Sequence, residues 1–240
     1  MNNIYLNELG KGFKSAESRK SKLETARNLT RKMLTRENPG VFPTGDELTS
    51  LDDLANQLFG LKEWGTTTTK CTKCSATHSS VPSFSGSQTV VYDSELHSTY
   101  KKHYAVSHWM TAQKIRANSR KCSRCKKSLI QVTTLDEAPP MFYLSLSDNS
   151  MLFGQFLTLS QAQNRHRYVL RGVTYFANKH FTARLIKPDG NVWYHDGIET
   201  GSKTLHEGLL SEQGPRFLNS KLRDGAARES VGLLYCRVDI

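Results

Sequence analysis

The 240-residue sequence contains no run of apolar residues close to the roughly 20 that a helix needs to cross a membrane. Its first 20 residues, MNNIYLNELGKGFKSAESRK, also lack the apolar segment of a secretory signal. These two absences predict a protein with no membrane partner that resides inside the cell, in the cytoplasm or the nucleus.

Acidic residues are scarce relative to basic ones. The chain has 22 Asp and Glu against 33 Lys and Arg, a formal net charge of +11. Such an excess attracts polyanions, or an acidic face of a partner protein. Charge alone carries no information about the fold, and a soluble protein with a basic surface is the simpler interpretation. Weak nucleic-acid binding through this charge therefore stays open.

Cysteine is also rare, with five in the chain, and four of these form two Cys-x-x-Cys pairs: Cys71 with Cys74, and Cys122 with Cys125. In an intracellular protein, such pairs indicate a metal rather than disulfides. Each pair can form a tight turn that offers two thiolates, so two pairs provide the four ligands of a tetrahedral zinc ion. Four protein ligands leave no position for water, which predicts a structural zinc site. A redox dithiol and unconnected core cysteines are the alternatives.

Two histidines, His78 and His108, lie near these cysteines in the sequence. A single histidine in a polar loop is more often solvated than bound to a metal. The predicted ligand set therefore consists of the four cysteines alone.

The order of elements predicts an α+β fold, with helices first and a sheet last. Apolar periodicity predicts helices over 13–37 and 46–60, the second with Thr49 or Ser50 as N-cap and Gly60 at its end. Residues 94–122 are ambiguous between helix and strand, and we interpret them as an inserted polar segment. β-Branched or alternating residues predict strands in 64–71, 87–93, 167–176, 180–188, 191–197 and 231–240, and two further runs within 128–149 that Pro139 and Pro140 separate.

The segment NKHFTARLIKPDGNVWYHDG, residues 178–197, predicts a β-hairpin around the turn PDGN. Antiparallel pairing brings His195 or Asp196 near His180. A carboxylate beside a histidine fixes its tautomer and favours its protonated form. Such a pair can act as general base and then general acid toward a thiol nucleophile. Taken alone, a histidine and an aspartate at hairpin ends are more often ordinary surface groups.

Five pieces of the sequence, counting the two cysteine pairs as one, together resemble the ubiquitin-specific proteases, which are cysteine peptidases that cut the isopeptide bond after the C-terminus of ubiquitin. CTKC and CSRC are similar to the zinc knuckles of that family. APPMFYLSLSDN and VGLLYCRV resemble its palm strands, YVLRGVTYFANKHFTARLI its histidine box, and NVWYHDG the box that supplies the third triad member. The segments occur in the family's order, and the resemblance covers about residues 60–240.

The resemblance implies a papain-like cysteine peptidase fold in three parts. Residues 1–60 correspond to a remnant of the helical thumb, 61–135 to zinc-binding fingers, and 136–240 to an antiparallel β palm with the histidine box. It further implies thiol-dependent deubiquitination, with ubiquitin or a ubiquitin-like protein as partner. His180 is then the catalytic base, and Asp196 orients it, with His195 as the alternative orienting residue.

The sequence departs from the family at the nucleophile. In the family this cysteine lies in an N-terminal Cys box that opens a helix, whereas residues 1–70 contain no cysteine. We therefore expect the chain to begin after that box. Cys236 lies in an apolar closing strand, unlike the accessible electropositive setting of a reactive cysteine. The chain is expected to be inactive alone, and the alternatives are a non-catalytic ubiquitin-binding module and a basic zinc protein that binds nucleic acid.

Overall fold

The computed structural model describes residues 20–44, 50–60, 62–147, 151–201, 203–213, 217–219 and 229–238. The chain divides into two compact units, Met1–Lys62 and Glu63–Ile240. No helix in these ranges is both long enough and apolar enough to span a membrane.

The first unit contains two helices, α2 (Lys20–Glu37) and α3 (Leu51–Phe59). The sequence predicted both, although residues 13–19 and Thr49 lie outside the described residues. Ser50 is the N-cap of α3, since its Oγ accepts the Asp53 N–H at 3.4 Å. The apolar side of α3 contributes to a small core around the buried Leu34 and Phe42. The partly buried residues of this core are Met33, Val41, Leu54 and Leu58.

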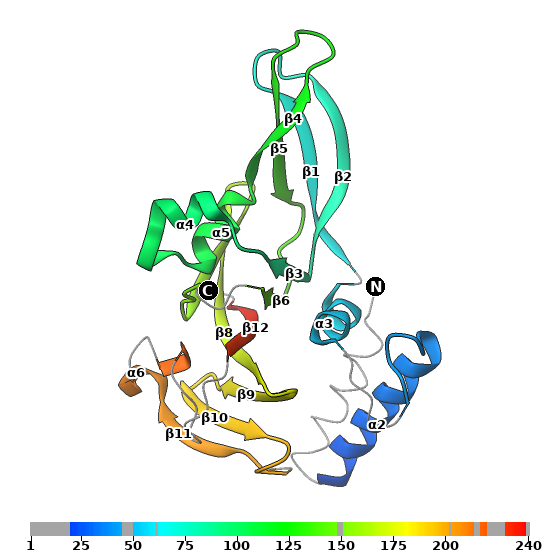
Figure 1. Ribbon diagram of the computed structural model, residues 1–240, viewed down its shortest axis with the longest axis vertical. Coiled ribbons are helices and arrows are strands. Elements are labelled where there is room, and N and C mark those ends of the chain that lie inside the picture. The colour runs from blue at the N-terminus through cyan, green and yellow to red at the C-terminus, as the bar shows by residue number, and fades with distance from the viewer. Residues whose placement is uncertain are drawn as a thin grey trace. The chain divides into compact units, whose positions relative to one another are not determined.

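The second unit begins with a four-stranded antiparallel sheet, here called the finger sheet, in the order β2-β1-β5-β4. Its central strands are rich in threonine, and the Thr67 hydroxyl lies 2.8 Å from both Ser83 and Thr133 hydroxyls. Figure 1 shows that the β1–β2 and β4–β5 connections lie at the same end of this sheet. The strands are β1 (Glu63–Cys71), β2 (Thr77–Ser85), β4 (Ile115–Lys121) and β5 (Ser128–Leu135).

The segment interpreted from sequence as a polar insertion folds differently. It forms α4 (Ser94–Tyr100), a 3-10 turn (Lys101–His103) and α5 (Val106–Ala112) before β4. Asp93 caps α4, since its Oδ1 accepts the N–H groups of Glu95 and Leu96. On α5 three side chains, Val106, Trp109 and Met110, are buried in the main core. The interpretation was wrong because two short helices, with few apolar residues each, give too short a periodic pattern to recognise.

A second, larger sheet follows the order β11-β10-β9-β8-β12-β6-β3, and β7 pairs with the first half of β8. All its pairs are antiparallel except β3 with β6. The α+β class is thus confirmed. The elements are β3 (Ser87–Val90), β6 (Met141–Leu146), β7 (Phe156–Gln161), β8 (Asn164–Ala177), β9 (His180–Ile186), β10 (Asn191–Asp196), β11 (Leu205–Leu209), α6 (Leu210–Gln213), a 3-10 turn (Phe217–Asn219) and β12 (Glu229–Val238).

One face of this sheet carries the main core, to which β6, β8 and β12 contribute large buried side chains. The Phe142 ring stacks on Tyr235 with 5.6 Å between centroids and meets Tyr168 edge to face at 4.9 Å. The Tyr168 hydroxyl donates to the Pro139 carbonyl at 2.8 Å, so this buried polar group is satisfied. The hairpin of β9 and β10 extends this packed sheet, and its alternate residues Thr182, Arg184, Ile186, Val192, Tyr194 and Asp196 are buried.

Candidate functional site

His180 is held at the first position of β9 by a two-residue turn. Ala177 and His180 face each other across β8 and β9, and Asn178 and Lys179 between them have φ angles of 52° and 61°. Two positive φ angles are typical of a type I′ turn, which matches the twist of the flanking strands. Asn tolerates this conformation, whereas Lys179 adopts it at a cost of about 1 kcal/mol. The histidine backbone is therefore tightly positioned.

The β9–β10 hairpin brings Asp196 to this histidine. Gly190, with a φ of +85°, lies in the connecting turn, and Asp196 pairs with Thr182 two residues beyond His180. Because alternate residues share a face, His180 and Thr182 lie on the same side as Asp196. The His180 Nε2 and Asp196 Oδ1 atoms are 2.7 Å apart. The imidazole side chain is 23% exposed and the carboxylate is fully buried, so the pair combines an accessible ring with an inaccessible anion.

The buried Asp196 carboxylate accepts several further hydrogen bonds. Its Oδ1 accepts the N–H groups of Ile198 at 2.9 Å and Glu199 at 3.1 Å, and its Oδ2 accepts the Tyr194 hydroxyl at 3.2 Å. Burial alone would raise the pKa of Asp196. The hydrogen bonds from Glu199, His180 and Ile198 outweigh burial and lower this pKa to about 2. Asp196 is thus a stable anion at neutral pH.

Because the pKa of Asp196 is lowered in the folded protein, the free energy of unfolding depends on pH. A carboxyl whose folded pKa lies below its unfolded value, about 3.9, stabilises the fold fully above that value. The contribution is lost as the pH falls toward 2. We expect the free energy of unfolding to decline between about pH 4 and pH 2, and Asp196→Asn to flatten this decline in denaturant titrations. The exposed control Glu229→Gln should keep the wild-type slope; equal slopes in all three proteins would contradict the expectation.

His195 faces the other side of the hairpin. Successive strand residues alternate, so His195 points away from the face that carries Asp196. Its Nδ1 lies 3.1 Å from the Lys203 carbonyl oxygen. Of the two alternatives for the orienting group, the structure thus brings Asp196 into contact with His180.

A buried ion pair anchors the same hairpin, and sequence analysis did not anticipate it. The Arg184 guanidinium donates to both carboxylate oxygens of Glu207, at 2.7 and 3.1 Å, and to the Phe217 carbonyl at 2.8 Å. Its Cζ also lies 4.3 Å from the Phe217 ring centroid. The side chains of the pair are only 2% and 4% exposed. β9 is thereby connected to β11 and to the 3-10 turn that follows it.

The four paired cysteines converge at one end of the finger sheet. The Sγ atoms of Cys71 and Cys125 lie 3.3 Å apart, those of Cys74 and Cys122 lie 3.7 Å apart, and those of Cys74 and Cys125 lie 3.8 Å apart. All four sulfurs lie within 4.8 Å of one another. Tetrahedral zinc with Zn–S bonds near 2.3 Å requires sulfurs roughly 3.8 Å apart. The donor set and its spacing therefore fit a structural zinc ion.

The two cysteine turns share their backbone geometry. Each second cysteine is followed by a residue with positive φ, Ser75 at 55° and Lys126 at 60°. In the first turn the N–H groups of Lys73 and Cys74 point at the Cys71 sulfur, at 3.4 and 3.5 Å. Such N–H groups stabilise a thiolate, the form that binds a metal.

His78 is a further neighbour of the cluster that sequence analysis set aside. From β2 its Nε2 lies 3.2 Å from the Cys122 sulfur. Hydrogen bonds from the Cys125 N–H, the His78 ring and the Arg124 N–H lower the pKa of Cys122 to about 6 although burial opposes them. His78 is thus an outer-shell group for the predicted metal. Its place four residues after Cys74 was a signal, but the contact needs the assembled finger sheet, which brings β2 and the end of β4 together.

Cys236 lies away from both sites. On β12 it pairs with Met141 and Val169, and burial raises the pKa of its thiol. Val169 precedes Ala177, the partner of His180, by eight residues. At about 3.3 Å per residue, Cys236 is therefore roughly 25 Å along the sheet from His180.

No family model and no curated protein sequence matches this chain. Solved structures do match. A chain of the SAGA DUB module Ubp8/Sgf11/Sus1/Sgf73 bound to monoubiquitin aligns with 90% of this chain and 48% of its own length, at 10% identity and a TM-score of 0.51. A chain of the yeast SAGA DUB module with an Sgf73 mutant aligns with 91% and 50%, at 11% identity and a TM-score of 0.50. This chain thus shares its fold with a chain of SAGA DUB modules and spans about half of that chain's length.

Proposed function

We propose that this chain is a ubiquitin-specific-protease-like domain that binds ubiquitin or a ubiquitin-like protein. It contains the acid–base half of a thiol protease site and does not hydrolyse isopeptide bonds by itself. In this proposal residues 1–60 correspond to the thumb, 61–135 to the zinc-bearing fingers and 136–240 to the palm of a papain-like fold. Within 61–135, β3 and α5 contribute to the larger sheet and its core and so extend the palm. The fold likeness to a SAGA DUB module chain, whose complex includes monoubiquitin, supports this reading.

The 2.7 Å contact between His180 and Asp196 is the observation that carries the proposal. A general base needs a ring that substrate can reach and an orienting group that solvent cannot displace, and this pair has both properties. The Asp196 carboxylate is hydrogen-bonded to Nε2 of His180, so Nδ1 is the ring atom that would meet an attacking thiol. Asp196 is the orienting residue of this proposal, and His195, on the other face, is not.

The nucleophile is the part that these 240 residues do not supply. Four of the five cysteines form the cluster in the finger sheet, where zinc would act only to hold the two turns together. The fifth, Cys236, is far from His180 along the sheet. Loss of a triad nucleophile costs many orders of magnitude in rate, as the subtilisin case shows. Binding without turnover is the activity that this set of residues supports.

Calorimetric titration of ubiquitin into the full chain tests the proposal. We expect saturable binding of intact ubiquitin, and at least about tenfold weaker binding of ubiquitin without its C-terminal tail, since the tail would lie beside His180. His180→Ala should weaken binding of intact ubiquitin, whereas His195→Ala, on the opposite face, should not. A fluorogenic ubiquitin substrate should show no turnover.

Two results would contradict the proposal. If ubiquitin and related ubiquitin-like proteins produced neither heat in the titration nor a shift in the unfolding temperature, the chain would not bind them and the proposal would be wrong. Turnover that a thiol alkylator abolishes would show that one of the five cysteines acts as a nucleophile.

A further inference from the structure

Apart from Glu63, the first residue of β1, the finger sheet carries only positive charge. The remainder of its strands and cysteine turns, residues 64–85 and 115–135, contains eight Lys and Arg and no Asp or Glu. All eight basic side chains are exposed. A zinc ion held by four thiolates would have a net charge of about −2 and would offset only part of this excess. The exposed cations are Lys70, Lys73, Arg116, Arg120, Lys121, Arg124, Lys126 and Lys127.

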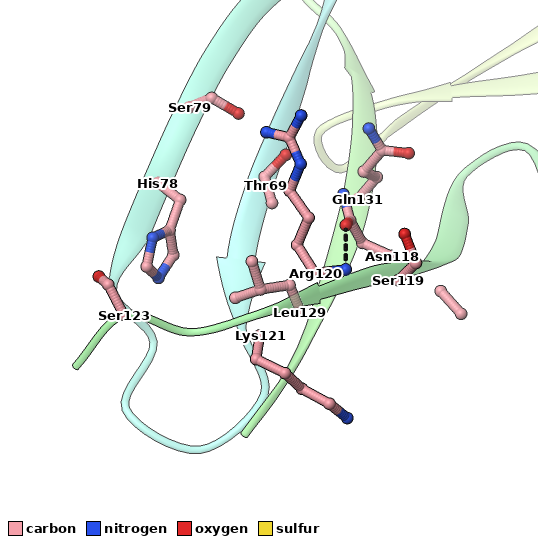
Figure 2. Close-up of a pocket in the computed structure, with 11 residues that line it drawn as sticks. Thr69, His78, Ser79, Asn118, Ser119, Arg120, Lys121, Ser123, Leu129 and Gln131 are labelled. Atoms are coloured by element: carbon pink, nitrogen blue, oxygen red, sulfur yellow. Dashed lines mark hydrogen bonds between the residues drawn. The ribbon is translucent and has the colours of Figure 1, made fainter. Parts of the chain in front are cut away.

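A polar pocket of about 570 Å³ lies within this charged sheet. In Figure 2 the Arg120 side chain extends between Thr69 and Gln131, and Lys121 points in the opposite direction. The remaining lining residues are mostly hydroxyl and amide side chains, among them Ser79 and Asn118, and no carboxylate lines the pocket. Hydroxyl, amide and guanidinium groups are the side chains that donate hydrogen bonds to phosphate oxygens.

The composition of this surface favours a nucleic acid over an acidic protein as its anionic partner. Residues 65–83 and 115–135 contain no Phe, Trp or Tyr. Protein–protein interfaces are enriched in aromatic anchors in a desolvated centre, and surfaces that stack on bases also use aromatic rings. A surface of cations and small donors without Phe, Trp or Tyr is suited to contacts with a charged backbone, which carry no sequence information.

We propose that the end of the finger sheet that carries the cysteine turns binds the phosphodiester backbone of a nucleic acid. Arg120 and the neighbouring hydroxyl and amide groups donate hydrogen bonds to a phosphate in the pocket. Binding is independent of base sequence, and DNA and RNA single strands of equal length bind alike, because contacts to phosphate involve neither the bases nor the 2′-hydroxyl. The inference does not rest on ubiquitin binding, which is assigned to the palm around His180.

Fluorescence anisotropy of the zinc-loaded full chain with labelled single-stranded DNA and RNA of the same sequence tests this inference. For roughly five neutralised phosphates, log K should fall with log salt at a slope near −3.5, since each phosphate on a single strand contributes about −0.7. The triple variant Lys73→Gln, Arg120→Gln, Lys127→Gln should bind about tenfold more weakly or worse at fixed salt. Its slope should be shallower by about 2.

A matched triple variant separates this site from net charge. Arg165→Gln, Lys179→Gln, Lys203→Gln removes the same charge from exposed positions outside the finger sheet and should leave binding within about twofold. Equal losses in both triples would overturn the proposal in favour of diffuse attraction to the whole basic chain. Zinc content and thermal unfolding verify that the finger triple folds, and Arg120→Lys, which keeps the charge at this position, should bind nearly as well as wild type.

Competition defines the ligand class. Polyglutamate at equal charge concentration should not displace the oligonucleotide; displacement would assign the surface to an acidic protein instead. A clear preference for one base sequence, or binding that does not weaken with salt, would also overturn backbone recognition. His180→Ala should leave nucleic-acid affinity unchanged, so failure of this inference and failure of ubiquitin binding are distinguishable.

Discussion

Cys122→Ser is expected to abolish tight zinc binding and to destabilise the finger sheet. The protein should contain about one zinc ion per chain, and the variant far less after dialysis against a weak chelator. Zinc binding to structural sites contributes roughly 10–16 kcal/mol of folding free energy in zinc-finger peptides. Loss of one of four thiolates, at a buried position that joins β4 to the second turn, removes much of that stabilisation. Elemental analysis and thermal unfolding measure the two effects.

Two further variants make this expectation specific. Cys236→Ser, in a strand of the larger sheet, should keep full zinc content. His78→Ala should weaken zinc binding by about 10- to 100-fold, the usual cost of an outer-shell partner, and so fall between wild type and Cys122→Ser. Unchanged zinc content in Cys122→Ser, or equal loss in Cys236→Ser, would show that the four cysteines do not form the metal site.

Glu207→Gln is expected to produce the largest loss of stability from a single change in the larger sheet. It leaves the Arg184 charge almost fully buried with only a neutral partner. Breaking one side of a buried ion pair costs roughly 3–5 kcal/mol because the remaining charge is uncompensated. Chemical denaturation, with urea or guanidinium, measures this difference in unfolding free energy.

The double variant Arg184→Met, Glu207→Leu separates the buried charge from the loss of contacts. It removes both charges and replaces them with apolar volume, so it should be more stable than Glu207→Gln. Glu229→Gln changes an exposed carboxylate and should have an effect within about 0.5 kcal/mol. A double variant less stable than Glu207→Gln would mean that the ion pair itself contributes net stability.

Local sequence signals predicted the elements that carry the candidate site. The PDGN turn and the strands on either side predict a hairpin, and antiparallel pairing then brings His195 or Asp196 near His180. The two Cys-x-x-Cys pairs likewise predicted one cluster, since each pair needs only its own turn. His180 and Asp196 are 16 residues apart on adjacent strands of one hairpin, whereas contacting cysteines of the two pairs are 48 to 54 residues apart and were recognised by their repeated Cys-x-x-Cys motif.

Contacts between distant segments that no sequence motif marks were not predicted. β2 is an exposed polar edge strand that includes Pro82, and neither apolar alternation nor a buried run marks it. Arg184 and Glu207 are 23 residues apart, and each alone resembles a surface charge. His78 meets Cys122 only after β4 and β5 complete the finger sheet. Such contacts follow from tertiary packing, which local periodicity does not encode.

The tight turn at Asn178 and Lys179 limits how the length of this chain can vary. Side-chain direction in a strand inverts with every residue, so one inserted or deleted residue between Ala177 and His180 would turn the imidazole to the opposite side of the sheet. Because β10 pairs with β9, the Asp196 carboxylate would turn with the imidazole, and the pair would leave the buried face of the sheet. Among homologous chains that keep the histidine–aspartate pair, insertions and deletions should accordingly be absent from this loop, whatever the tolerance of the finger connections.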